Sequence, residues 1–430
     1  MKSLYYVFFK IGSPFFLICK LQNDTLIFIL VKHNRDKYCS YNIGEIHMDM
    51  KEKALTSHKE WNGKLETTAK SKVNSREDLA IAYTPGVAEP CKKIAQDKSL
   101  AYTYTWKANT VAVVSDGSAV LGLGNIGPHA AIPVMEGKCV LFKEFGNVNA
   151  VPICLDTQDT EEIITAVKNI APGFGGINLE DISAPRCFEI EERLKEILDI
   201  PVFHDDQHGT AIVVLTGVIN ALRLTDKKKE ACKVVVNGAG SAGVAITKLL
   251  LRYGFTNVLM CDKEGIIGKD YPNLNWMQKK MTEMTNLSNE IGTLADALRG
   301  ADIFVGVSAP NIVTADMVAS MNKDAILFSM ANPVPEIMPD VAKAAGARIV
   351  GTGRSDFPNQ VNNVIAFPGI FKGALEGRAS QITEEMKLAA AEALAALVSD
   401  EELNEDFIMP EAFDPRVPEV VSQAVKEHIK

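Results

Sequence analysis

Residues 175–211 read GGINLEDISAPRCFEIEERLKEILDIPVFHDDQHGTA, and this stretch indicates the fold. It contains two short apolar segments, 176–179 and 200–203, and residues 186–198 between them carry apolar side chains at helical spacing. A strand, a crossover helix and a second strand of this length form a right-handed parallel unit. We therefore predict an α/β fold in which both strands end at the same edge of one sheet.

A pair of carboxylates follows each predicted strand: Glu180 with Asp181, and Asp205 with Asp206. Four acids at one sheet edge repel one another, and a divalent cation relieves that repulsion. Oxygen ligands without any Cys or His ligand spacing favour Mg²⁺ or Mn²⁺ over Zn²⁺. Each pair alone has an ordinary alternative, as acids that cap a helix or lie in a solvated loop. Two pairs in register favour the cation site.

The composition narrows the class of protein. A chain of 430 residues is too long for one hydrophobic core, so we expect two domains. The net charge of −9 leaves no basic surface for nucleic acid, and we expect no such partner. The eight cysteines are scattered without a CxxC pair, which indicates reduced thiols in a cytoplasmic protein.

Residues 1–49 differ from the rest of the chain. Their apolar runs are interrupted by Lys10, Lys20 and Asn23, so none reaches the ~18 residues of a membrane span. No small-residue cleavage site follows the first run, as a signal peptide would require. We expect a non-native or disordered N-terminal extension and a functional start at Met48 or Met50. The alternative is an anchor at a membrane surface.

From residue 50 onward, predicted strands alternate with helices, as in α/β proteins. We expect residues 50–206 to form an α/β domain with the substrate and metal site. Residues 207–430 are then a doubly wound, Rossmann-type NAD-binding domain with C-terminal helices. Polar residues at its strand ends, where ligands of such sheets bind, include Ser308, Asn332 and Asn363. The alternative for both asparagines is a structural turn.

Two other residues are candidates for proton transfer. Lys138 lies in a predicted helix over residues 133–146, which Pro133 opens and Gly146 ends. Its apolar neighbours would desolvate the amine and lower its pKa towards a value useful for proton abstraction. Tyr83 opens a Tyr-Thr-Pro-Gly turn that fixes the direction of its phenol. A snorkelling surface lysine and a core tyrosine are the ordinary alternatives.

Two glycine fingerprints, GLGNIG at 122–127 and GAGSAG at 238–243, compete for a dinucleotide. In the first, the strand ends about seven residues too early and Pro133 postpones the helix. In the second, KVVVN runs directly into the glycines, which let the backbone approach a pyrophosphate at the helix N-terminus. We therefore predict that the cofactor is bound by Gly238, Ala239, Gly240, Ser241, Ala242 and Gly243.

Asp262 ends the next predicted strand, at the distance suited to the adenosine ribose hydroxyls. Its carboxylate would repel a 2′-phosphate, which favours NAD over NADP. Lys263 beside it weakens that preference.

Six segments together resemble the malic enzymes of the short bacterial and archaeal type: YTPGVAEPC, PVMEGKCVLFK, GINLEDISAP, FHDDQHGTA, NGAGSAG and NNVIAFPGI. They occur in the right order and cover the chain from about residue 50 to its end. The resemblance implies oxidative decarboxylation of L-malate to pyruvate and CO2 with reduction of NAD(P)⁺. It also implies a homodimer or higher homo-oligomer.

The resemblance further implies a role for each matching residue. Tyr83 is the general acid and Lys138 the general base, and Asp205 lies near Lys138 and tunes its protonation. The remaining assignments are Glu180, Asp181 and Asp206 to the metal, and Asn332 and Asn363 to substrate and nicotinamide. The larger eukaryotic-type enzymes carry a malate-binding arginine before GLGxxG, which this chain lacks, leaving Ser118, the glycine-loop backbone or Arg186 for that task.

Three rival functions remain. A malolactic enzyme would use the same groups, retain the NADH and release lactate. An oxaloacetate decarboxylase would be a partial activity of the same site. A nucleotide-sensing binding protein without catalysis would leave the convergent carboxylates and the lysine without a purpose.

Overall fold

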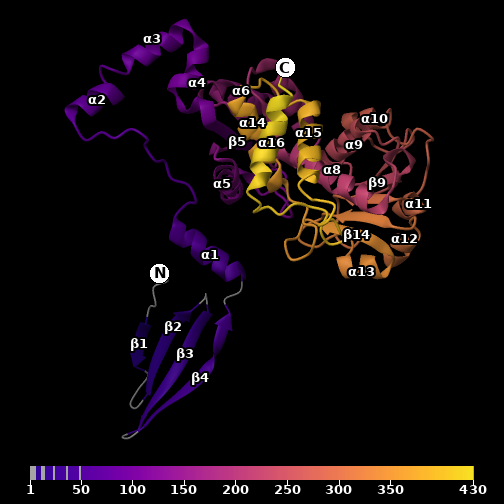
Figure 1. The fold of residues 1–430 in the computed structure, drawn as a ribbon, viewed down its shortest axis with the longest axis horizontal. Helices are drawn as coiled ribbons and strands as arrows, with labels where there is room; N and C mark the ends of the chain where they lie inside the picture. The colour runs from indigo at the N-terminus through magenta and orange to yellow at the C-terminus, as the bar shows by residue number, and fades with distance from the viewer. Residues whose placement is uncertain (1–5, 11–14, 23–24, 35–36, 48–49, 430) are drawn as a thin grey trace. The chain divides into compact units, whose positions relative to one another are not determined.

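The computed structural model describes residues 6–10, 15–22, 25–34, 37–47 and 50–429, the first four segments by their backbone alone. The chain divides into two compact units, Met1–Glu66 and Thr67–Lys430, and their elements are labelled in Figure 1.

The first unit contains an antiparallel sheet in which neighbouring strands follow chain order. Its elements are β1 (Tyr6–Lys10), β2 (Phe15–Gln22), β3 (Thr25–Asn34), β4 (Lys37–His47) and α1 (Met50–Trp61). The proposed start at Met48 lies outside the described residues. The prediction that residues 1–49 are a non-native or disordered extension stays a prediction, which N-terminal sequencing of the native protein tests.

The second unit begins with helices and a four-stranded parallel sheet of order β6-β5-β7-β8. The strands are β5 (Thr110–Ser115), β6 (Asn149–Cys154), β7 (Gly176–Leu179) and β8 (Val202–His204). The helices are α2 (Arg76–Ala82), α3 (Ala88–Gln96), α4 (Ala101–Tyr104), α5 (Gly127–Gly146), α6 (Thr160–Ile170) and α7 (Arg186–Ile197). The predicted unit of strand, crossover helix and strand is confirmed as β7, α7 and β8.

A second sheet follows, of order β11-β10-β9-β12-β13-β14, parallel except for β11. Its strands are β9 (Lys233–Asn237), β10 (Asn257–Asp262), β11 (Gly265–Ile266), β12 (Ile303–Gly306), β13 (Ala325–Ser329) and β14 (Ala347–Thr352). The helices are α9 (Ser241–Tyr253), α10 (Trp276–Met281), α11 (Leu294–Leu298), α12 (Ala315–Ala319) and α13 (Pro339–Ala344). The predicted doubly wound, Rossmann-type arrangement is confirmed.

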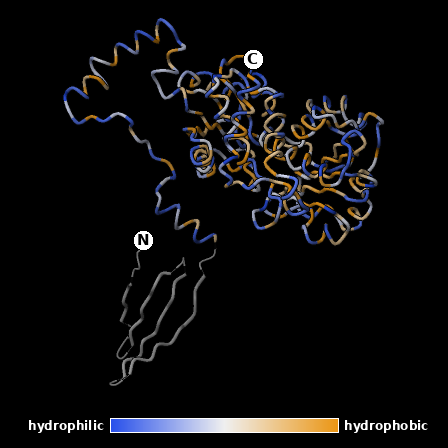
Figure 2. Tube along the Cα trace, viewed as in Figure 1, coloured by the Kyte–Doolittle hydropathy of each residue, from blue (hydrophilic) through white to orange (hydrophobic). Residues whose placement is uncertain are grey.

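Helix α8 (Asp205–Thr225) connects the two sheets and is mostly buried. It is long and apolar enough to cross a membrane, yet 67% of its most apolar stretch is buried inside the protein, as in the core helix of a globular domain. Hydrophobic residues follow the inner helices and strands around it (Figure 2). The side chains of its buried face join both sheets into one hydrophobic cluster.

The last three helices return to the first sheet. They are α14 (Phe367–Glu376), α15 (Glu384–Ala395) and α16 (Arg416–Glu427). Helix α14 packs on α5, where the ring of Phe142 meets those of Phe367 and Phe371 edge-on at centroid distances of 4.7 and 5.3 Å. Helix α15 packs on α8. The C-terminal segment therefore helps to hold the helix that carries Lys138.

One predicted boundary is wrong. Helix α5 begins at Gly127 rather than at Pro133, which lies inside it. Pro128 already occupies the first turn, where a missing N–H costs nothing, so it supplies the start signal that we assigned to Pro133. The argument that Pro133 postpones the helix after GLGNIG therefore fails.

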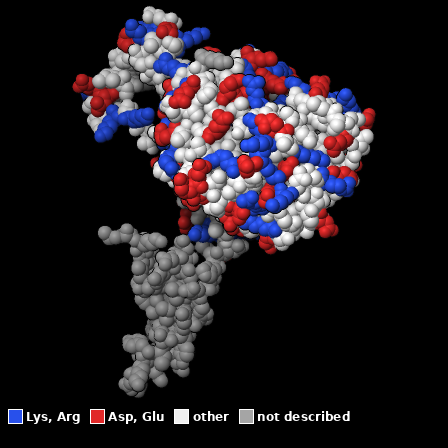
Figure 3. Space-filling view, turned by 45° about the vertical axis from the view of Figure 1, so that its right-hand side comes forward, with Lys and Arg blue, Asp and Glu red and all other residues white. Residues whose placement is uncertain are grey.

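The surface carries charges of both signs. On the face shown in Figure 3, Lys and Arg are interspersed with Asp and Glu, and neither sign forms a continuous field. Of the six cysteines whose side chains are described, all are free thiols.

Candidate active site

The carboxyl edge of the first sheet gathers the predicted acids. Strand β7 ends at Leu179 and leads directly into Glu180 and Asp181, while β8 ends at His204 and α8 starts with Asp205. Because β7 and β8 are parallel neighbours, both pairs of acids emerge at the same edge.

Glu180, Asp181 and Asp206 each direct one oxygen to a common point, and these oxygens lie within 4.8 Å of one another. The backbone N–H of Asp181 donates to Asp206 Oδ2 at 2.8 Å, which fixes the two loops together. Asp181 Oδ2 is buried and has no hydrogen-bond donor. Three oxygens with one orphaned acceptor fit a hard divalent cation.

The pKa values of the acids indicate a site that favours a positive charge. Burial, followed by the nearby Asp206 and Glu180 carboxylates, raises the pKa of Asp181 to about 9. Burial also raises the pKa of Asp206 to about 6, although Lys138 opposes it. A bound cation would reverse these shifts, because it stabilises the ionised carboxylates.

Lys138 reaches the same edge from α5 and is only 8% exposed. Its ammonium lies 2.5 Å from Asp205 Oδ2 and 3.0 Å from Glu180 Oε1, over the ring of Phe367. Burial lowers the pKa of Lys138, but the carboxylates of Asp205 and Glu180 outweigh it and hold that pKa above its ordinary value. The prediction of a lowered pKa for Lys138 is therefore wrong. It rested on the apolar residues beside Lys138 in the sequence, whereas the acids that raise the pKa come from distant segments of the chain.

Two residues that the sequence analysis did not single out hold these groups in place. Asn178 Nδ2 donates to Glu180 Oε2 at 2.8 Å. Gly209 faces Asp205, and a Cβ there would lie 2.0 Å from Asp205 Oδ1. Asn178 alternates with Glu180 along β7, and Gly209 lies one helical turn after Asp205, so both spacings were visible in the sequence.

The second sheet contributes the wall of a cavity of about 430 Å³ that also contains Asp206. Five predicted residues, Gly240, Ser241, Ala242, Gly243 and Ser308, line it, as do both predicted substrate residues, Asn332 and Asn363. Asn363 also donates to Asp205 Oδ2. Asp206 therefore connects the carboxylate edge to this cavity, whereas Lys138, Glu180, Asp181 and Asp205 are not among the residues that line it.

The glycine loop depends on its missing side chains. Gly238 has φ of +113°, and a Cβ on Gly243 would lie 1.7 Å from the carbonyl oxygen of Gly238. Only glycine lets the loop fold this tightly against the start of α9. Ala239, the remaining residue of the predicted loop, is buried between them.

Buried Glu336, which the sequence analysis missed, joins the two strand ends beside the cavity. Its carboxylate accepts from the backbone N–H of Ser308 at 2.9 Å and from that of Ala331 at 3.0 Å. It follows Asn332 by four residues, and no local pattern marks it, because its partner Ser308 follows a different strand, 28 residues earlier in the chain.

Asp262 ends β10 beside the glycine loop but is not among the residues that line the cavity. Its carboxylate accepts from the backbone N–H of Lys263 at 2.9 Å and from Gln278 Nε2 at 3.2 Å. The contact of Asp262 with the adenosine ribose stays a prediction.

Tyr83 lies apart from these groups. It is 68% exposed, it follows α2, which has no buried residue, and it does not line the cavity. Figure 1 shows α2 standing away from the two sheets.

The sequence provides three candidates for binding the malate carboxylate. Arg186 already donates to Asp116 at 2.9 Å and to Ser118. The glycine loop is better placed, because Gly122 lines the cavity.

A Rossmann-type sheet with a glycine-rich loop, facing a buried lysine and an acid cluster, defines a dinucleotide-linked oxidoreductase. Two family models match the chain: the malic enzyme N-terminal domain over residues 62–195 and the malic enzyme NAD-binding domain over residues 207–427. The chain belongs to the malic enzyme family, and it is an NAD- or NADP-dependent oxidoreductase. The resemblance found in the sequence is thereby confirmed.

Individual relatives agree. The bifunctional malic/malolactic enzyme of Bacillus subtilis is 57% identical over 379 residues, which cover 88% of this chain and 92% of that protein. The NAD-dependent malic enzyme of Geobacillus stearothermophilus is 59% identical, with 85% of this chain and 76% of that protein covered. The crystal structure of the Thermotoga maritima NAD-dependent malic enzyme is 52% identical, covers 88% of this chain and 99% of that chain, and has a TM-score of 0.84.

Proposed function

We propose that this malic enzyme converts L-malate to pyruvate and CO2 with NAD⁺ as the preferred oxidant, NADP⁺ as the alternative, and Mg²⁺ or Mn²⁺ as the metal. The observation that carries the proposal is the contact of Lys138 with Asp205 and Glu180, at the edge where Asp206 shares a cavity with the glycine loop. The base and the proposed metal ligands therefore meet at one sheet edge, and Asp206 connects that edge to the cavity bordered by the glycine loop.

In this proposal, Lys138 accepts the proton of the malate C2 hydroxyl and returns it later in the cycle. The neighbouring acids raise the pKa of Lys138, and a cation bound to Glu180, Asp181 and Asp206 would oppose that effect and favour the neutral amine. Asp205, which contacts the amine and is itself held by Asn363, orients it. Asn332 and Asn363 supply amide groups for the substrate and the nicotinamide. A bound dinucleotide would accept the C2 hydride. A cation on Glu180, Asp181 and Asp206 would act as a Lewis acid on the C2 oxygen and favour loss of CO2.

The test is a set of initial rates with NAD⁺ and NADP⁺, each with and without Mn²⁺. We expect malate-dependent reduction that requires the metal and is faster with NAD⁺. Absence of any rate under all four conditions would refute the proposal.

The Bacillus subtilis relative gives a specific reason to consider malolactic turnover, since its name includes that activity. The two reactions differ in whether NADH leaves before pyruvate is reduced. Free NADH formed in step with pyruvate supports the malic reaction. Lactate formed without accumulation of NADH would favour the malolactic one.

The ribose contact of Asp262 should set the preference for NAD. Replacing Asp262 with Ala removes a charged hydrogen-bond acceptor, so we expect kcat/KM for NAD⁺ to fall by about 10- to 100-fold. The value for NADP⁺ should fall less or rise, because a repulsive charge is lost. Glu264→Gln, two residues away, is the control and should leave both values unchanged. An equal fall for both cofactors would contradict the ribose contact.

Tyr83 completes the chemistry only if a second copy supplies it, and we propose a homodimer for this reason. Leu79 and Ile81, on α2 beside Tyr83, are 51% and 69% exposed. The loop before α5 exposes Leu121 and Leu123 by 70% and 65%, and its backbone borders the active-site cavity. Packing α2 of one copy against this loop of another would cover both apolar surfaces and bring a phenol to protonate C3 of enolpyruvate.

Mixed dimers test this arrangement. Tyr83→Phe and Lys138→Ala should each lower kcat by about 10²- to 10⁴-fold. A purified heterodimer of the two variants should regain about half of the wild-type activity per dimer, because one of its sites combines both intact residues. If Tyr83 acted within its own chain, each site would keep one lesion and the heterodimer would stay inactive.

We also propose a cytoplasmic location, and the free thiols of the described cysteines support it.

A further inference from the structure

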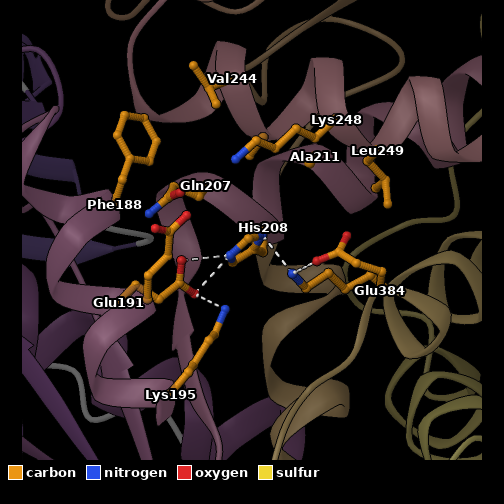
Figure 4. Close-up of a pocket in the computed structure, with 13 residues that line it drawn as sticks. Phe188, Glu191, Lys195, Gln207, His208, Ala211, Val244, Lys248, Leu249 and Glu384 are labelled. Carbon is orange, nitrogen blue, oxygen red and sulfur yellow. Dashed lines mark hydrogen bonds and ion pairs between the residues drawn. The ribbon is translucent and has the colours of Figure 1, made fainter. Parts of the chain in front are cut away.

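A second cavity lies beside the first turn of α8 and takes no part in the proposed chemistry. Its lining comes from α7, α8, α9 and α15, and its volume is about 120 Å³ (Figure 4). Since one water takes about 30 Å³ of the liquid, this volume corresponds to about four waters or to a small organic ligand.

Four charged groups of this cavity are already paired. Glu191 accepts from His208 Nε2 at 2.8 Å and lies 2.7 Å from Lys195 Nζ. Lys387 Nζ lies 3.0 Å from His208 Nδ1 and 2.7 Å from Glu384, and Figure 4 shows the ring of His208 between the two pairs. This network accounts for two positive and two negative charges.

Two donors remain without an acceptor. Lys248 Nζ extends from α9 into the cavity and has no hydrogen bond or ion pair among the described residues (Figure 4). Gln207 is only 4% exposed, and its buried Nε2 has no partner. The remaining acid, Glu192, is exposed to solvent on the following residue of α7. The acids and lysines of the lining balance in number, and the charge of Glu192 acts on Lys248, but among the described residues neither Lys248 Nζ nor Gln207 Nε2 has a hydrogen-bond acceptor.

The rest of the wall is apolar. The side chains of Phe188, Val244 and Leu249 face the cavity, together with Ala211 and Ala245. An inorganic anion would satisfy the donors but leave this surface in contact with water. A carboxylate with a short hydrocarbon body would accept from the two donors and also cover the apolar wall.

We propose that this cavity binds a short-chain organic monocarboxylate, whose oxygens accept from Lys248 and Gln207 and whose hydrocarbon body packs on Phe188 and Val244. Burial lowers the pKa of Lys248, and a bound carboxylate would raise it again by stabilising the charged ammonium. Gln207 follows Asp206 directly, and Lys248 lies on the helix that opens with the glycine loop. A carboxylate bound in this cavity would therefore connect α8 to α9. Because these helices carry Asp206 and the glycine loop, its binding should change the KM values for malate and for the dinucleotide.

Ligand-observed NMR on the full chain tests the binding without turnover, so its result is independent of the proposed reaction. The probes are isovalerate, 3-methylbutylammonium with the same body and opposite charge, and inorganic phosphate without a body. We expect isovalerate to bind with a Kd on the order of millimolar. Lys248→Met should weaken it at least tenfold, while Lys323→Met, an exposed lysine with the same charge change, should not.

Lys248→Met removes no hydrogen bond of the described chain, so we expect it to fold, and an unchanged melting temperature verifies this. Isovalerate should also shift the KM of the wild type, and this shift should disappear in Lys248→Met. Equal affinity in Lys248→Met, tighter binding of phosphate or of the ammonium probe, or no isovalerate binding at all would each overturn the proposal. A KM shift that survives the substitution would place isovalerate in the active site instead and would also overturn it.

Discussion

Replacing Lys138 with Ala should lower kcat by about 10²- to 10⁴-fold while NAD⁺ binding stays as in the wild type. The amine is the only basic nitrogen that the described residues place against both Asp205 and Glu180, and proton transfer by a positioned side chain accounts for an effect of this size. Dinucleotide binding should persist, because the glycine loop lies on the other sheet. Stopped-flow turnover and fluorescence titration with NADH measure the two quantities.

Lys143→Ala is the matched control for Lys138→Ala. Lys143 lies on the same helix, but it is exposed and hydrogen-bonds to Asn147 and Asn149 rather than to the acid cluster. Its loss should leave kcat within about twofold, as for surface substitutions away from a site. A near-normal rate in Lys138→Ala, or an equal loss in both variants, would remove Lys138 from the mechanism.

Replacing Asp206 with Asn should abolish the response to Mn²⁺ and lower kcat by about 10³-fold or more. Lewis-acid stabilisation contributes several kcal/mol to such a transition state, and ~1.4 kcal/mol corresponds to a factor of ten. Of the three proposed ligands, Asp206 connects the two loops, since its Oδ2 also accepts from the backbone N–H of Asp181. Electron paramagnetic resonance of free Mn²⁺ measures the lost affinity directly.

Asp156→Asn provides the control for the metal prediction. Asp156 follows β6 at the same sheet edge, but it is exposed and outside the acid cluster. It should bind Mn²⁺ as the wild type does. If Asp206→Asn kept its Mn²⁺ affinity, the cation would have to bind elsewhere and the proposed ligand set would be wrong.

Most of the fold could be predicted from local patterns. The acids come directly after short apolar strands, and a parallel crossover unit leaves little freedom in where strand ends emerge. The GAGSAG loop was identified because strand, glycines and helix are continuous in the chain. The start of α5 was missed because two prolines compete as first-turn residues, and only Pro128 satisfies that role in the structure.

The site was predicted less completely, because its decisive contacts join distant segments. Asn178 and Gly209 lie within four residues of the acids that they support, so their spacing in the sequence gave a weak indication of these contacts. Glu336 left none, since its carboxylate binds backbone N–H groups after two different strands. The pKa of Lys138 was predicted in the wrong direction because its apolar sequence neighbours are outweighed by Asp205 and Glu180, 67 and 42 residues away.

The sequence by itself determined which residue types leave the carboxyl ends of the strands and which loop can approach a pyrophosphate, because backbone geometry and side-chain chemistry act over a few residues. Only the tertiary structure decided that Lys138 meets Asp205 and Glu180, and that Tyr83 stays exposed just after α2. It also decided that Lys248 and Gln207 face a second cavity without hydrogen-bond acceptors. These features depend on distances between segments far apart in the chain, which packing of α5, α8, α9 and α14 around the common core sets.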